Sequence, residues 1–134
     1  MSNETTVNVR VKVGRFIFLG LAGLFVLCVT IQIFIAGMAV FTNASYWRYH
    51  VVFVRIFELF PILMLIFSFL GRLSKALRWW CVAIFILIYA QYFTAHFPGA
   101  GAFHPVMAAV LFSVSLLVFV KAKRSVSARE AKLS

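Results

Sequence analysis

Four long apolar stretches divide the chain, and each is separated from the next by a short polar or aromatic segment. Each stretch reaches or approaches the length of about 20 residues that a helix needs to cross the hydrocarbon core of a bilayer. Helices are expected at about residues 16–41, 50–70, 77–95 and 102–120. Their short connections favour antiparallel neighbours in a bundle. The pattern predicts an all-α, integral membrane, up-down four-helix bundle over residues 16–120, with tails at residues 1–15 and 121–134.

The composition excludes an ordinary soluble domain. Hydrophobic residues make up 64% of the chain, charged residues 12%, and the mean hydropathy is +1.03. These values are typical of an integral membrane protein. In a soluble protein a net charge of +10 would favour nucleic-acid binding. Here the basic residues lie in the segments between the apolar stretches, so we expect the lipid bilayer as partner and no nucleic acid.

The basic residues also predict how the chain is oriented. Three Lys and Arg precede the first helix, three lie between the second and the third, and five follow the fourth. Four alternating helices place these eleven of the thirteen basic residues on one side of the membrane. Short loops rich in Lys and Arg stay on the cytoplasmic side. We therefore expect both termini to be cytoplasmic and the protein to be a multi-pass component of the cell membrane.

The second expected helix carries ionisable residues inside an apolar stretch. A carboxylate or guanidinium at the bilayer centre costs at least about 2.5–3.5 kcal/mol, so such groups face the bundle interior, find a partner or reach the interface. Arg55 and Glu58 are three positions apart, which makes them neighbours on a helix and able to neutralise each other. Pro61 removes a backbone donor and should kink the helix. This helix is expected to form one wall of a polar site.

All three histidines are expected at the same end of the bundle. His50, His96 and His104 lie at the outer ends of the second, third and fourth helices. Gln32 and Gln91 lie somewhat deeper from the same side, whereas the inner half of the bundle is almost entirely aliphatic and aromatic. This asymmetry predicts a polar site that opens toward the outer face of the membrane.

Three interpretations of this site stay open. In the first, His50 and His104 are axial ligands of a b-type haem, held by two diagonal helices with a flat macrocycle between them. In the second, the histidines and Glu58 bind a divalent metal or relay protons, with Arg55 and Gln32 orienting the carboxylate. Arg55, Glu58 and His96 would form the polar relay. In the third, the polar residues only hold helices together, each contact contributing about 0.6–2 kcal/mol.

A set of residues spread over the four helices resembles a known family. Residues 32–37 read QIFIAG, His50 opens the second helix, Gln91 lies in the third, and His104 and Pro105 open the fourth. This pattern is similar to small prokaryotic four-helix membrane proteins of a domain-of-unknown-function family, DUF6220. The resemblance implies the four-helix fold and an outer polar site built on Gln32, His50, Gln91 and His104, and it brings no known activity.

The predicted function is that of a small polytopic membrane protein whose site takes haem b or another redox cofactor through His50 and His104, with Gln32 and Gln91 beside them. One alternative is a structural or partner-binding accessory subunit without a cofactor, as a homo-oligomer or with a partner membrane chain. Another is a small proton- or metal-coupled transporter that uses Glu58. The sequence contains no Walker loop, nucleophile elbow or zinc-protease helix. We therefore predict no catalytic residue and do not expect an enzyme.

Overall fold

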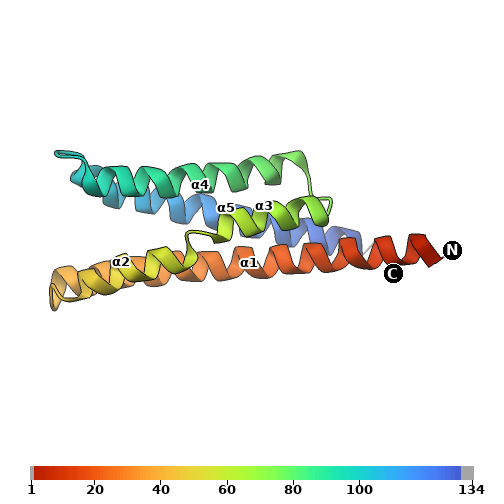
Figure 1. Ribbon diagram of the computed structural model, residues 1–134, viewed down its shortest axis with the longest axis horizontal. Helices are drawn as coiled ribbons and strands as arrows, with labels where there is room; N and C mark the ends of the chain where they lie inside the picture. Colours follow the sequence, from red (N-terminus) through yellow and green to blue (C-terminus); the bar gives the residue numbers. More distant parts are fainter. Residues whose placement is uncertain (1, 131–134) are drawn as a thin grey trace.

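The computed structural model describes the backbone of residues 2–130 and the side chains of residues 9–128, and this part of the chain consists of helices and turns (Figure 1). The elements are α1 (Ser2–Phe41), α2 (Tyr46–Phe57), α3 (Phe60–Leu70), α4 (Lys75–His96), the 3-10 helix η1 (Gly101–Phe103) and α5 (His104–Glu130). Four segments are long and apolar enough to cross a membrane: Val9–Phe41, Tyr46–Leu70, Lys75–His96 and Gly101–Ala128. The prediction of an all-helical chain with four candidate spans is confirmed.

The helices form two hairpins that pack against each other (Figure 1). In the first hairpin α1 contacts α2 and α3, and in the second α4 contacts α5. The hairpins meet where α1 contacts α5 and α3 contacts α4, so α2 and α3 lie diagonally opposite α5. The start of α1 and the end of α5 lie at one end of the molecule, which we call the terminal end. The turns at residues 42–45 and 97–100 lie at the opposite end, which we call the turn end.

Both the first and the last helix extend beyond their expected bounds. α1 begins at Ser2 instead of near residue 16, and α5 continues to Glu130 instead of ending near residue 120. The expected bounds followed the apolar stretches, but backbone hydrogen bonding continues through polar residues when no proline interrupts it. Residue 1 and residues 131–134 of the predicted tails lie outside the described residues, and the side of the membrane on which the tails lie stays a prediction.

The second span is broken rather than only kinked. α2 ends at Phe57, Glu58 is its C-cap, and α3 starts at Phe60. Pro61 lies at the start of α3, where its missing N–H is tolerated because the first turn of a helix has no intrahelical acceptor for it. In a continuous helix its ring would clash with the carbonyl of Phe57, four residues earlier. The proline therefore ends one helix and starts the next, and Glu58 lies at the junction.

The core is formed by large apolar side chains from both hairpins. The largest buried side chains are Phe18, Phe25, Phe57, Met64, Ile84 and Val118. Many other large apolar side chains point outward, among them Phe34, Ile56 and Ile86. An apolar surface of this extent marks a region that contacts lipid or another protein.

A close contact between α1 and the α3–α4 turn fixes the terminal end of the bundle. An added Cβ on Gly14 would lie 2.8 Å from the backbone nitrogen of Gly71, and one on Gly71 would lie 3.0 Å from the backbone nitrogen of Arg15. Arg15 Nε donates a hydrogen bond of 2.8 Å to the Gly71 carbonyl. Glycine is required at both positions, because a Cβ on Gly14 or on Gly71 would lie too close to the backbone of the other segment.

Candidate functional site

His50 and His104 approach each other at the turn end, one from each hairpin. His50 lies in the second turn of α2, and His104 is the first residue of α5. Their ring centroids are 6.2 Å apart, and the ring planes are inclined at 62°. Both side chains are half-buried. Residues 54 positions apart in the sequence thus form one contact across the boundary between the hairpins.

Gln32 holds His50 from the neighbouring helix. The Gln32 side-chain nitrogen donates to the carbonyl oxygen of His50 at 2.9 Å. In return, His50 Nδ1 lies 3.2 Å from the backbone carbonyl oxygen of Gln32. The two residues therefore form a reciprocal pair that ties α1 to α2 near the turn at residues 42–45.

Gln91 forms a matching pair with His104 in the second hairpin. His104 Nδ1 lies 3.1 Å from the backbone carbonyl oxygen of Gln91. The Gln91 amide is satisfied when its oxygen accepts from the backbone nitrogen of Ala108, at 2.6 Å, and its nitrogen donates to the His104 carbonyl, at 3.1 Å. Each hairpin thus has a glutamine late in its first helix that is paired with the histidine near the start of its second helix.

Thr94 joins the His104 pair from the same face of α4. Its hydroxyl donates to the Gln91 carbonyl at 3.0 Å, and the same oxygen lies 3.2 Å from His104 Nδ1. If the His104 ring carries its proton on Nδ1, it can donate that proton to Thr94 Oγ1 or to the Gln91 carbonyl oxygen. The Gln91 amide nitrogen also lies 2.9 Å from Nδ1 and can donate to the other tautomer. A ligand on Nε2 selects the tautomer with its proton on Nδ1, as it does in metal-binding histidines generally.

Gln32 also contributes an acceptor that is not yet used. Its side-chain oxygen is buried and has no hydrogen-bond partner among the described residues. A buried acceptor without a donor costs about 1–3 kcal/mol. The Gln32 side-chain oxygen is therefore open to a donor from outside the described residues.

The remaining predicted site residues form a second cluster around the helix break. Glu58 accepts a hydrogen bond of 2.5 Å from the Tyr92 hydroxyl. Arg55 is exposed and close enough to act electrostatically on Tyr92, but among the described residues it forms no ion pair with Glu58. The expected neutralisation of Glu58 by Arg55 is therefore replaced by a hydrogen bond from another helix. Glu58 keeps helical backbone geometry at the C-cap of α2, with its N–H bonded to the Val54 carbonyl, so its partner follows from the packing of α4 and not from the spacing of the two residues.

His96 does not join either cluster directly. It is the last residue of α4 and is exposed. Its Nδ1 lies 2.8 Å from the carbonyl oxygen of Tyr92, one turn earlier, and its ring stacks on the Tyr92 ring with a centroid distance of 6.5 Å. His96 is thus at the same end of the bundle as the other two histidines but does not converge with them.

Two participating residues were missed by the sequence analysis. Thr94 is three positions after Gln91 and so lies on the same helical face, a spacing that could have identified it. Tyr92 was indistinguishable from the other aromatic residues near the end of its helix, because the sequence does not show that α4 faces the break between α2 and α3.

The histidine cluster offers two imidazoles as possible metal ligands. Among residues 9–128 no group of three or more His, Cys, Asp or Glu side chains could hold a metal ion. Haem needs only two protein ligands, because the porphyrin supplies four nitrogens. The His50 and His104 ring centroids are 6.2 Å apart, with the ring planes inclined at 62°.

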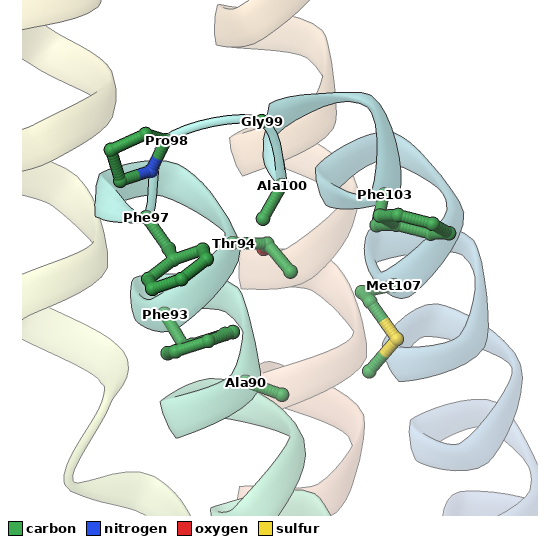
Figure 2. A pocket seen from close by; sticks show the side chains of 9 residues that line it. All are labelled: Ala90, Phe93, Thr94, Phe97, Pro98, Gly99, Ala100, Phe103 and Met107. Atoms are coloured by element: carbon green, nitrogen blue, oxygen red, sulfur yellow. The ribbon is translucent and has the colours of Figure 1, made fainter.

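A groove lies beside the histidine cluster, on the outward side of the second hairpin (Figure 2). It has a volume of about 590 Å³ and lies between α4, α5 and the turn that joins them. Phe93, Phe97, Phe103 and Met107 give it an apolar lining, and Thr94 is the residue that it shares with the histidine cluster. The groove is open, and none of its lining residues is ionisable. It therefore adds apolar surface next to the site but no acid or base.

One family model matches the chain. It is described as a family of unknown function, DUF6220, and it covers residues 32–101. The matched segment begins at Gln32 and includes His50, Glu58 and Gln91. Neither the curated proteins nor the solved structures contain a match to the chain.

Proposed function

The chain belongs to the DUF6220 family, which carries no assigned activity, and we propose that it binds a b-type haem through His50 and His104. The protein is then a multi-pass, non-enzymatic membrane protein of electron transfer or haem handling. The observation that carries this proposal is the pair of matching glutamine–histidine contacts, which bring the two rings to a centroid distance of 6.2 Å.

Each residue of the cluster has a role in this proposal. His50 and His104 provide one Nε2 ligand each, because both Nδ1 atoms face backbone carbonyls of the preceding helix. Gln32, Gln91 and Thr94 fix the ring orientations, as the partners of metal-binding histidines commonly do. A bound haem supplies reversible one-electron chemistry.

The proposed orientation places the histidine cluster toward the outer face of the cell membrane. The turn end carries Arg48 in the first turn of α2, whereas ten basic residues within the described residues 2–130 lie in segments at the terminal end. Positively charged short segments stay in the cytoplasm. Both termini are therefore cytoplasmic in this proposal, and electrons or haem are exchanged at the outer side.

The visible absorption spectrum tests the haem proposal. The full chain is expressed with haem precursor, purified in detergent and measured as isolated and after reduction with dithionite. We expect a Soret band and sharp reduced α and β bands in the wild type, with haem content reduced at least about tenfold in His50→Ala and His104→Ala. His96→Ala is the matched control and keeps its haem, because His96 contacts only its own helix.

A colourless wild-type protein that is folded, monodisperse and still unable to bind added haemin would overturn the proposal. It would leave the role of a structural or partner-binding subunit, in which the same contacts only hold the helices together. Loss of haem in His96→Ala to the same extent as in His50→Ala would also contradict the assignment of the ligands.

The Glu58–Tyr92 contact supports a second candidate function, proton-coupled transport. Intramembrane carboxylates often mark proton pathways, and broken helices often form transport sites near the middle of the bilayer. Glu58 has both features, because it lies between α2 and α3 and receives its hydrogen bond from α4. Protein reconstituted in vesicles with a trapped pH indicator should show proton flux that Glu58→Gln abolishes. Equal flux through wild type, Glu58→Gln and protein-free vesicles would exclude this function.

A further inference from the structure

A cluster of basic residues lies at the terminal end, far along the bundle from the histidines. It is formed by Arg72 in the α3–α4 turn and by Lys75 and Arg78 in the first turn of α4. We call these three residues the basic turn. Lys75 and Arg78 are three positions apart and therefore share one face of the helix, where like charges repel each other.

Arg78 differs from the surface cations because part of its guanidinium group is buried. Its Cζ atom lies 4.2 Å from the centroid of the Phe69 ring, so the group is held against the aromatic face. Its Nε atom is buried and has no hydrogen-bond partner among the described residues. A charged donor left in this state is costly, and an anion placed against the guanidinium group would offset that cost.

The conformation of the turn fixes the backbone of Arg72. Arg72 has a φ of 47°, in the left-handed region that residues other than glycine seldom adopt. The preceding residue, Gly71, is held against α1 by its backbone contact with Gly14 and by the hydrogen bond from Arg15 Nε. The exposed Arg72 side chain therefore starts from a fixed position of the turn.

No carboxylate among the described side chains compensates these charges. The whole sequence has three acidic residues, Glu4, Glu58 and Glu130. Of these only Glu58 has a described side chain, and it accepts from Tyr92 at the helix break. Within residues 9–128 the basic turn is therefore left open to an anion from outside the chain.

The surroundings indicate which anion fits. Phe69 and Leu70 precede the basic turn and Trp79 follows Arg78, with exposed fractions of 56%, 55% and 63%. Exposed aliphatic and aromatic side chains suit acyl chains, and tryptophan is typical of the headgroup region. A ligand that offers an anionic group next to apolar chains matches this combination better than a soluble ion does.

We propose that the basic turn binds the phosphate of an anionic phospholipid, with Arg78, Lys75 and Arg72 around the phosphate and the acyl chains along Phe69 and Trp79. Arginine and lysine both bind phosphate through charge-assisted hydrogen bonds. Basic residues next to a span are attracted to anionic lipid by about 1 kcal/mol each. The Arg78 guanidinium held against the Phe69 ring distinguishes this site from a general attraction to anionic lipid, and the site does not depend on what His50 and His104 bind.

Native mass spectrometry of the full chain with phosphatidylglycerol tests the proposal. We expect one phosphatidylglycerol molecule per chain to be held more tightly than any further copies. Arg78→Gln should weaken this first adduct at least about tenfold, the loss expected for a hydrogen bond to a charged group. Lys123→Gln is the matched control, since Lys123 is an exposed cation on α5 at the same end. It removes the same charge and should weaken binding by less than about fivefold.

A second variant and a measurement in nanodiscs complete the test. Arg72→Gln changes an exposed side chain in the turn and must also weaken the first adduct, so it decides the matter if Arg78→Gln does not fold. In phosphatidylcholine nanodiscs, added phosphatidylglycerol should raise the thermal midpoint and inorganic phosphate should not. Identical adducts in wild type and Arg72→Gln, equal losses in Arg78→Gln and Lys123→Gln, or an equal effect of inorganic phosphate would each overturn the proposal.

Discussion

His50 and His104 are held in the same way although they belong to different hairpins. Each has Nδ1 directed at the backbone carbonyl of a glutamine in the preceding helix. The Gln32 amide donates to the His50 carbonyl, and the Gln91 amide can do the same for His104 in the orientation that lets its oxygen accept from Ala108 N. Such contacts fix a side chain that would otherwise lose rotamer freedom on binding. Two similar contacts on opposite sides of one boundary suit a flat ligand with two equivalent faces.

Thr94 offers the sharpest test of how His104 is oriented. Thr94→Val keeps the shape of a buried side chain but removes the oxygen 3.2 Å from His104 Nδ1. Loss of such a partner typically lowers metal affinity by about 10–100-fold, so we expect at least about tenfold weaker haem binding in a haemin titration. Thr30→Val is the control, because Thr30 is exposed and donates only to the Val26 carbonyl of its own helix. Equal haem affinity in the two variants would mean that Thr94 does not position the ligand.

The hydrogen bond between Tyr92 and Glu58 is expected to contribute to stability. Tyr92→Phe leaves the Glu58 carboxylate without its donor and should lower the free energy of unfolding by about 1–3 kcal/mol. Tyr89→Phe removes a hydroxyl from a side chain that is 61% exposed and should change little. The measurement is the unfolding free energy in detergent titrations. If the two variants lose the same stability, the contact at the helix break is not a stabilising one.

At the scale of the helices, the sequence predicted the elements well and their junctions less well. The four candidate spans and the convergence of Gln32 with His50 follow from apolar length and from antiparallel pairing across a short turn. The sequence predicted a kink where the structure has a break at Glu58. Pro61 indicates that the helix is disturbed, but packing against the other helices decides whether the result is a kink or a break. The contact of Tyr92 with Glu58 depends on which face α4 presents to α3, and single-sequence patterns do not fix that rotation.

The crossing of α1 with the α3–α4 turn predicts opposite effects for two similar substitutions. In Gly14→Ala the new Cβ would lie 2.8 Å from Gly71 N and 3.0 Å from Leu70 C, which are backbone atoms and cannot move alone. Overpacking of this kind typically costs about 1–3 kcal/mol. Gly20→Ala meets nothing within 4 Å and gains up to about 1 kcal/mol of helix propensity.

Thermal midpoints in detergent compare the two glycine variants directly. We expect Gly14→Ala to lower the midpoint and Gly20→Ala to leave it unchanged or raise it. A midpoint for Gly14→Ala equal to that of the wild type would show that the α1 crossing is loose enough to adjust by a few tenths of an ångström.

At the scale of the whole molecule, the polar groups lie at the two ends and at the helix break between them. The histidine cluster lies at the turn end, the Glu58–Tyr92 contact lies at the helix break, and the basic turn lies at the terminal end with the basic segments of α1 and α5. A molecule with cations concentrated at one end and titratable imidazoles at the other has one favoured orientation in a membrane. The functions proposed for the two ends therefore belong to opposite membrane faces.

Cysteine labelling with a membrane-impermeant maleimide tests this orientation. Ser45→Cys changes an exposed residue at the turn end that makes no side-chain capping bond, and Ala76→Cys changes an exposed residue beside the basic turn. The native Cys28 and Cys81 are free and buried, so wild-type protein provides an unlabelled background. In intact cells we expect labelling of Ser45→Cys alone, and labelling of Ala76→Cys only after the membrane is opened. The reverse pattern would place the histidines at the cytoplasmic face, so a bound haem would exchange electrons inside the cell and the basic turn would meet the outer leaflet.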